Sequence, residues 1–276
     1  MKRRKRAYQI TIKVLLGIVG LFTMAPILLA LMNSFKTNGE LLSNVIALPK
    51  ALDLENYIRT FDKMSYWRSL GNTVFLAAFS VILICLFSAM AGWKLCRTKT
   101  KLAKVIYGLF VFSMLIPFSS IMIPLYKVVL SLGLKNSLAG LSLIYAGTGT
   151  SMAIFIYYGF VKSIPIELEE AAAIDGCSSI KTFFLIVFPM LKATTATVCI
   201  TNMLWVWNDF LLPLIVLSDN EKYTLLLSTN TLFGQYSSDW TAILSALILA
   251  ALPAIVLYIV FQKQIMRGIA DGAVKG

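Results

Sequence analysis

Six apolar stretches, each long enough to cross a lipid bilayer, constrain the fold of this chain most strongly. A membrane-spanning helix needs about 20 consecutive, mainly apolar residues. The stretches cover residues 12–32, 70–93, 105–125, 138–160, 189–207 and 240–261. Only 14% of the 276 residues are charged, whereas about a quarter are charged in a soluble domain. The sequence therefore predicts an all-α integral membrane protein with six transmembrane helices, in one domain that covers residues 1–276.

The distribution of charge predicts which side of the membrane each loop faces. Lysine and arginine are enriched in cytoplasmic loops. If the N-terminus is cytoplasmic, the inner segments carry the whole net charge of +12 and the outer charges balance. We therefore expect a multi-pass protein of the bacterial plasma membrane with both termini in the cytoplasm and no nucleic-acid partner. The first stretch is too long for a signal peptide, whose apolar region spans about 7–15 residues, so we expect it to be retained.

Two absences narrow the possible chemistry. The chain has no histidine, which removes the usual general base and the usual zinc ligand. It also lacks the phosphate-binding motif G-x-x-x-x-G-K-[S/T]. The four cysteines show no metal-type spacing and are predicted to be small buried apolar residues. We expect no catalytic residue, no metal and no cofactor, and any ATP must be hydrolysed by another subunit.

A polar segment, residues 161–188, separates the fourth and fifth apolar stretches. Pro165 suits the first turn of a helix that Ser163 can cap, and three glutamates follow near the positive end of the helix dipole. Gly176 suits a left-handed stop, and Ser178 or Ser179 can cap the next helix. One narrow helix face is formed by Leu168, Ala171, Ala172 and Asp175. These features fit both a solvated connector and a helix that docks into another protein.

The segment also contains a longer motif, P-x-E-L-E-E-A-A-x-x-D-G, followed by I-x-x-P. It resembles the EAA loop of the permease subunits of binding-protein-dependent ABC importers, which have the MetI-like fold. The resemblance implies a coupling helix that docks into a cleft of an ATPase subunit. The residues that it assigns to coupling are Glu169, Glu170, Ala171, Ala172, Ala173, Asp175, Gly176, Ile186 and Pro189. Phe188 and Ala193 depart from the usual leucine and proline, but both lie in the second helix of the loop.

Other parts of the chain are similar to the carbohydrate-uptake branch of this family. They are Ser34–Lys36, Asn72–Thr73, Trp205–Phe210 and the tail Gly268–Gly276, which is similar to the second permease of maltose-type systems. Leu54–Tyr57 resembles a stretch that is common after the first span of these permeases. The resemblance implies import of a sugar or sugar derivative that an extracytoplasmic binding protein delivers. It also implies two ABC ATPase subunits and a second, related permease subunit. The tail either reaches the ATPases or is a frayed terminus.

Candidate residues of the transport pathway lie in the fourth and fifth stretches. Polar groups at membrane depth face the helix bundle or a water-filled path. The candidates are Tyr145, Thr148, Thr150, Ser151, Asn202 and Trp205. Close helix packing explains the small residues at least as well, and tryptophan is enriched at membrane boundaries in any case. Both alternatives stay open.

A secondary, ion-coupled transporter is the main alternative function. Such proteins show internal repeats and ionisable groups buried in the membrane. Here Lys13 and Asp209 lie close to the ends of predicted spans, and no central acid is evident. A membrane-embedded enzyme ranks third, because the adjacent Glu169 and Glu170 point about 100° apart on a helix and cannot flank one bond.

Overall fold

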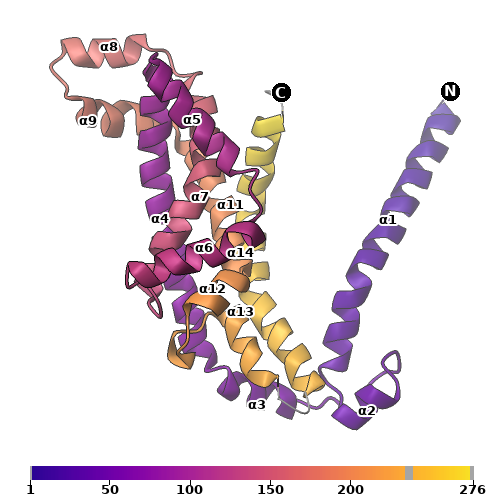
Figure 1. Cartoon of the computed structure of the whole chain (residues 1–276). Coiled ribbons are helices and arrows are strands. Elements are labelled where there is room, and N and C mark those ends of the chain that lie inside the picture. Colours follow the sequence, from indigo (N-terminus) through magenta and orange to yellow (C-terminus); the bar gives the residue numbers. More distant parts are fainter. Residues whose placement is uncertain (1, 234–238, 274–276) are drawn as a thin grey trace. The chain divides into compact units, whose positions relative to one another are not determined.

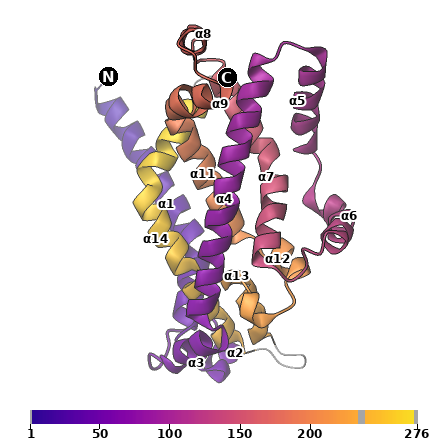
Figure 2. The same ribbon diagram turned by 90° about the vertical axis from the view of Figure 1, so that its left-hand side faces the viewer.

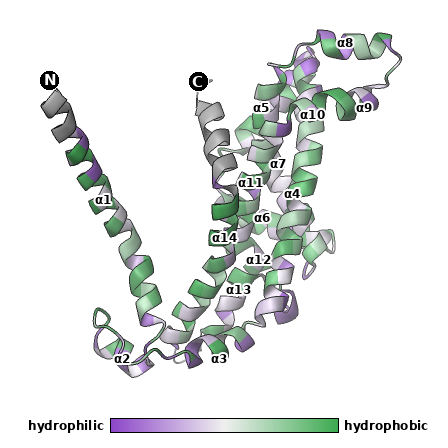
Figure 3. Ribbon diagram, turned by 180° about the vertical axis from the view of Figure 1, so that it is seen from behind, coloured by the Kyte–Doolittle hydropathy of each residue, from purple (hydrophilic) through white to green (hydrophobic). Residues whose placement is uncertain are grey.

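The computed structural model describes residues 2–233 and 239–273, with side chains described for residues 8–233, 239–260 and 262. The described residues form helices, turns and connections, without a strand. Four helices are long and apolar enough to cross a membrane: α1 (Lys2–Asn33), α4 (Tyr66–Arg97), α7 (Leu138–Val161) and α14 (Trp240–Ala273). Figures 1 and 3 show these helices and the apolar residues along them. The all-α membrane fold predicted from the sequence is confirmed.

Two bent pairs of helices are further candidate spans. The helices α5 (Lys101–Ser113) and α6 (Phe118–Ser131) meet at 110°, and the segment Ser179–Met190 meets α11 (Lys192–Asn208) at 78°. Counting each pair as one span gives six candidate spans. The predicted stretch 105–125 is therefore not one continuous helix. Pro117 interrupts it, because proline has no backbone N–H and disfavours a helical conformation in the residue before it.

Short helices connect these long elements. They are α2 (Asn38–Ser43), α3 (Glu55–Lys63), α8 (Glu167–Ile174), α9 (Ser179–Thr182), α10 (Phe188–Met190), α12 (Leu211–Val216) and α13 (Leu225–Ser228). The predicted tail Gly268–Gly276 continues α14 as far as Ala273, and residues 274–276 lie outside the described part of the chain. The chain divides into two compact units, residues 1–66 with 228–253 and residues 67–227 with 254–276.

In the first unit, two stretches that carry the family resemblance contact each other. The Asn56 side-chain amide donates to the carbonyl oxygens of Ser34 at 3.0 Å and of Lys36 at 2.8 Å. The Ser34 and Tyr57 hydroxyls are 2.6 Å apart. Asn56 is buried, so these bonds satisfy polar backbone groups where water is excluded. The sequence similarity at 34–36 and 54–57 therefore reflects one structural contact.

Asp239 joins the start of α14 to the same unit. Its carboxylate accepts hydrogen bonds from the Asn38 amide at 2.9 Å, the Thr241 hydroxyl at 2.9 Å and the Ala242 N–H at 3.1 Å, and lies 2.7 Å from the Arg59 guanidinium. Burial raises the pKa of Asp239, but these hydrogen bonds and Arg59 outweigh it and leave the pKa below its ordinary value. A depressed carboxyl pKa stabilises the fold above about pH 4, and this contribution is lost as the pH falls through the folded-state value.

Replacing Asp239 by asparagine is expected to destabilise this unit by about 1–3 kcal/mol, because the charge that holds its partners is removed. The measurement is the melting temperature of the detergent-solubilised protein at neutral pH. Asp62→Asn, at an exposed acid of α3, is the matched control and should leave the melting temperature unchanged. Equal melting temperatures for the two variants would contradict the role given to Asp239.

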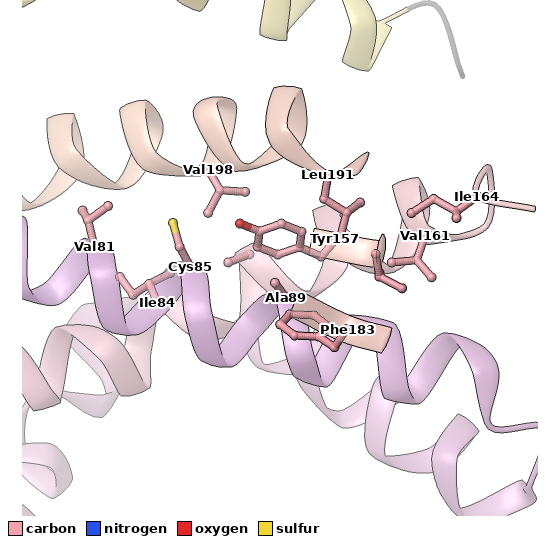
Figure 4. Close-up of a cluster of buried hydrophobic side chains, with 12 residues drawn as sticks. Val81, Ile84, Cys85, Ala89, Tyr157, Val161, Ile164, Phe183, Leu191 and Val198 are labelled. Carbon is pink, nitrogen blue, oxygen red and sulfur yellow. The ribbon is translucent and has the colours of Figure 1, made fainter. Parts of the chain in front are cut away.

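The second unit has its core around Tyr157 of α7, which is fully buried (Figure 4). Apolar side chains surround its ring from α4, from α11 and from the segment before α11. Its hydroxyl donates to Thr195 Oγ1 at 3.1 Å, so the one polar atom of this side chain has a partner. Figure 2 shows α4, α7 and α11 running along one another in this unit. The core therefore fixes the helices from which the polar segment 161–188 emerges.

Gly92 permits the close approach of α4 to α7. A Cβ atom at this position would lie 2.9 Å from the Tyr157 Cβ, 3.1 Å from the Tyr158 backbone nitrogen and 3.3 Å from the Ile154 carbonyl oxygen. At Gly71, on the same helix, a Cβ atom would have no other atom within 4 Å. Small residues allow such close approach in membrane helices.

Gly92→Ala is expected to destabilise the protein by about 2–3 kcal/mol, because backbone atoms must move to admit the methyl group. Gly71→Ala should be neutral or stabilising by up to about 1 kcal/mol, since alanine favours a helix. The two variants are compared by their melting temperatures in detergent and by the yield of monodisperse protein. A melting temperature for Gly92→Ala at or above that of Gly71→Ala would exclude the close contact.

Candidate functional site

The polar segment 161–188 forms a short helix, α8, that lies beyond the Arg97 end of α4 (Figures 1 and 2). The helix begins at Glu167 with Ile166 as its N-cap residue, and no side chain caps it. The prediction that Ser163 caps it was wrong, because the Ser163 hydroxyl instead donates to the Phe160 carbonyl oxygen at 2.7 Å. The predicted acidic first turn is confirmed.

The end of α8 agrees with the local sequence. Gly176 adopts a positive φ of 80°, a conformation that glycine reaches without strain. The Ser178 hydroxyl accepts a hydrogen bond from the Lys181 N–H, so Ser178 and not Ser179 caps α9. The chain then continues through the π-helical turn Phe183–Val187, which contains Ile186, into α10, which contains Pro189.

Glu169 is the acid of α8 that points toward the body of the protein. Its carboxylate accepts hydrogen bonds from Trp93 Nε1 at 2.9 Å and from Arg97 Nε at 2.8 Å. A second guanidinium nitrogen of Arg97 lies 2.8 Å from the same carboxylate. The side chains are only 12% exposed for Glu169 and 18% for Arg97, so the ion pair is largely shielded from water. Sequence reasoning missed Trp93 and Arg97, since nothing local links them to a residue more than 70 positions later.

The other residues assigned to coupling differ in exposure. Ala172 is buried, whereas Glu169 and Ile186 are half-buried. The exposed members are Glu170, Ala171, Ala173, Asp175, Gly176 and Pro189. Between them lies Ile174, whose side chain is 86% exposed. Ile174 lies between Ala173 and Asp175, inside the matched motif, and this position together with its exposure makes it a candidate contact for another protein.

A pocket of about 460 Å³ opens between the α5–α6 bend, α7 and α11. Its lining residues are Ser113, Met114, Ile116, Phe118, Ile121, Gly147, Thr148, Ser151, Met152 and Trp205. A smaller pocket of about 210 Å³ shares Thr148, Met152 and Trp205 with it and adds Gly149, Thr201 and Asn202. Four of the six predicted pathway residues therefore meet at adjoining pockets: Thr148, Ser151, Asn202 and Trp205.

The pocket walls combine one aromatic surface with several small polar groups. Trp205 is 41% exposed and forms part of both pockets. The Ser113 and Ser151 hydroxyls are 2.7 Å apart and join α5 to α7. The Thr148 hydroxyl donates to the Ile144 carbonyl oxygen at 3.0 Å and keeps its acceptor capacity. Such a surface can stack on one face of a ligand and form hydrogen bonds at its edges.

Two predicted pathway residues do not line these pockets. Tyr145 is fully buried, and its hydroxyl donates to Asp209 at 2.8 Å. Its ring also meets the edge of Trp205 at a centroid distance of 5.3 Å. Thr150 donates a hydrogen bond to the Ala146 carbonyl oxygen within α7. Tyr145 therefore holds Trp205 in place. The Thr150 hydroxyl has its hydrogen-bond acceptor within its own helix.

The sequence also matches a known protein family. Residues 84–271 match the binding-protein-dependent transport system inner membrane component family. The chain belongs to this family. As a member, it is a permease subunit of an ABC importer and not a secondary transporter.

Two curated relatives of this permease match over almost their whole length. A probable starch degradation products transport system permease protein of Thermoanaerobacterium thermosulfurigenes is 40% identical over 263 residues, covering 94% of this chain and 95% of the relative. The melibiose/raffinose/stachyose import permease protein of Bacillus subtilis is 35% identical over 266 residues, covering 96% of each chain. Both alignments therefore include almost all of this chain.

A solved structure has the same fold as this permease. It is a bacterial ABC transporter involved in the import of the acidic polysaccharide alginate, with a TM-score of 0.80 and 24% sequence identity. The alignment covers 95% of this permease and 97% of that chain. The MetI-like permease fold therefore extends over almost the whole chain.

Proposed function

We propose that this permease is one of two related transmembrane subunits of an ATP-driven sugar importer. In this proposal residues 1–276 form a single membrane domain, and the subunit needs no catalytic residue, metal or cofactor of its own. The observation that carries the proposal is the structure of α8, which is anchored to α4 on one face and exposed on the other. Such an element suits an importer, because a packed structure with two arrangements can couple a change at one site to another site.

The exposed face of α8, residues Glu170, Ala171, Ala173, Ile174, Asp175 and Gly176, is the proposed coupling surface. Its small side chains allow a second protein to approach the helix backbone closely, and Ile174 supplies apolar area. We propose that one of two ABC ATPase subunits binds here and hydrolyses the ATP. Closure of the ATPases on ATP would move α8 and switch the access of the pathway. Ile186 and Pro189, farther along the loop, would support this surface.

The proposed solute is a sugar oligomer or sugar derivative. The names of the two relatives refer to starch degradation products and to melibiose, raffinose and stachyose. The pocket lined by Thr148, Ser151 and Trp205 suits this class, because an aromatic ring can cover the apolar face of a pyranose while hydroxyls bond its edges. Asn202, in the adjoining pocket, would extend the pathway.

The proposed orientation puts both termini and the coupling surface in the cytoplasm of a bacterium. Lysine and arginine concentrate on that side, as expected for cytoplasmic loops. The opposite side would receive the solute from an extracytoplasmic binding protein. This orientation also accounts for the net charge of +12 without a nucleic-acid partner.

Uptake by intact cells tests the proposed solute class. Cells that carry the permease gene should accumulate a radiolabelled oligosaccharide, such as a maltodextrin or raffinose. In cells without a second uptake system for that sugar, deletion of the gene should reduce uptake by at least about 10-fold, because the solute then has no pathway through the membrane. The purified binding protein should bind the same sugar. Unchanged sugar uptake after deletion, together with loss of uptake of an amino acid or an ion, would refute the sugar assignment.

A further inference from the structure

Two adjacent acids of α8 have opposite environments. Glu170 is exposed on the coupling surface, whereas the Glu169 side chain is only 12% exposed and faces α4. Residues that are neighbours on a helix point about 100° apart, so one turn can serve two surfaces. Glu169 was predicted to act together with Glu170 at the ATPase, but its position differs from that of its neighbour.

Both oxygens of the Glu169 carboxylate are engaged by α4. Trp93 Nε1 donates to one oxygen at 2.9 Å, and two nitrogens of the Arg97 guanidinium approach the other at 2.8 Å. Charge-assisted hydrogen bonds of this length are among the strongest in proteins. A carboxylate in this state has little remaining capacity to bind a residue of another subunit.

The same α4 side chains also bind the loop before and after α8. Arg97 donates to the Ile164 carbonyl oxygen at 2.8 Å, and Ile164 is buried. The Trp93 ring packs against Phe183, at a centroid distance of 5.5 Å, and Phe183 is fully buried at the start of the π-helical turn. Figure 4 shows Ile164 and Phe183 at the edge of the core around Tyr157. The last two turns of α4 therefore contact the chain ahead of α8, in α8 and behind it.

We propose that Glu169 is a positioning residue that transmits the movement of α8 to α4. Glu169 is distinct from the coupling surface. The ATPase moves α8, and the contacts of Glu169 with Arg97 and Trp93, called the clamp from here on, move α4 together with α8. The eight-residue helix α8 also contacts α9 and the π-helical turn, but the clamp formed by Glu169, Arg97 and Trp93 joins α8 directly to the long helix α4. α4 continues from Arg97 back to Tyr66, so a displacement at its cytoplasmic end reaches the whole span. This inference rests on the proposed coupling of the permease to an ATPase.

The test uses the complete transporter, permease pair, ATPases and binding protein, reconstituted in proteoliposomes. Glu169→Gln keeps the size of the side chain and an acceptor for Trp93, but removes the charge that Arg97 binds. We expect the variant to retain the ATPase through detergent purification and to hydrolyse ATP, while sugar taken up per ATP falls about 10-fold, as for other residues that carry coupling. Glu167→Gln, at an exposed acid of the same helix turn, is the matched control and should keep the wild-type ratio.

Two further variants separate transmission from folding. Arg97→Lys keeps the positive charge but cannot reach both Glu169 and Ile164, so it should lower the uptake per ATP in the same way. The double variant Glu169→Arg with Arg97→Glu restores opposite charges and should recover part of the ratio that each single variant loses. A merely structural role would lower the amount of assembled complex and leave its uptake per ATP unchanged, which would overturn the inference.

The outcomes also distinguish this inference from the proposed function. Loss of the ATPase from Glu169→Gln during purification would make Glu169 a docking residue and overturn its role in transmission. A wild-type uptake per ATP in Glu169→Gln would overturn it as well. If the unaltered permease binds no ATPase, the proposed function fails instead.

Discussion

Ala171→Arg is expected to release the ATPase from the permease and to abolish sugar uptake. Ala171 is exposed on α8 beside Ala173 and Ile174, where a partner helix or groove must come within van der Waals contact. An arginine there inserts a long charged side chain into the centre of the interface. Substitutions at interface centres cost about 2–4 kcal/mol, so the affinity for the ATPase should fall at least about 30-fold. The measurement is co-purification of the ATPase with tagged permease in detergent.

The matched control for this variant is Ser163→Arg. Ser163 is also exposed in the loop, but it precedes α8 and lies outside the coupling surface. Both variants should express and melt like the unaltered permease, because surface substitutions change stability by about 0.5 kcal/mol or less. Retention of the ATPase by Ala171→Arg, or its loss from Ser163→Arg alone, would move the docking site away from α8.

Gly147→Phe is expected to block the transport pathway without disturbing assembly. Gly147 lines the larger pocket, and no atom lies within 4 Å of a Cβ built at this position. A phenylalanine can therefore be accommodated on α7 and fill part of the space beside Trp205. If sugar passes through this pocket, uptake should fall at least about 10-fold, since one misplaced group in a binding site has effects of this size. The readout is the initial rate of sugar uptake into proteoliposomes at saturating ATP.

Gly159→Phe is the matched control on the same helix. Gly159 also has no atom within 4 Å of a built Cβ and is exposed, but it does not line either pocket near Trp205. Both variants should bind the ATPase equally and hydrolyse ATP. Normal uptake by Gly147→Phe, or an equal loss in both variants, would show that the sugar does not pass beside Trp205.

The features that the sequence predicted well depend on neighbouring residues. The acidic first turn of α8, the positive φ at Gly176 and the Ser178 cap of α9 follow from residues within a few positions of one another. Ser163 failed as a cap because the chain turns once more before α8 begins at Glu167. The start of a helix depends on how the preceding helix ends. This geometry cannot be deduced from the sequence of the loop alone.

The sequence indicates where the bend between α5 and α6 lies, but it does not indicate the angle of the bend. Pro117 favours a break or a bend of the helix at this position, but the local sequence does not give the 110° change of direction between α5 and α6. This bend, together with α7 and α11, creates the larger pocket. The predicted pathway residues all lie in the fourth and fifth apolar stretches, so the pocket residues that α5 and α6 contribute, such as Ser113 and Phe118, were not among them.

The different roles of similar residues could be recognised only from the tertiary structure. Glu169 and Glu170 are the same amino acid at adjacent positions, and the positions of Trp93 and Arg97 distinguish the clamped acid from the exposed one. Tyr145 and Trp205 were grouped as pathway candidates, but Tyr145 is fully buried against Asp209 and only Trp205 lines the pockets. Both distinctions depend on contacts between residues more than 60 positions apart.

Sugar uptake into proteoliposomes tests the central claim, that this chain is the permease of an ATP-driven sugar importer. The vesicles contain the permease pair with its ATPases, and the binding protein and a radiolabelled oligosaccharide are outside. ATP trapped inside the vesicles should drive accumulation of the sugar, and a proton gradient without ATP should drive none. Accumulation driven by the proton gradient alone, without ATP or binding protein, would contradict the account.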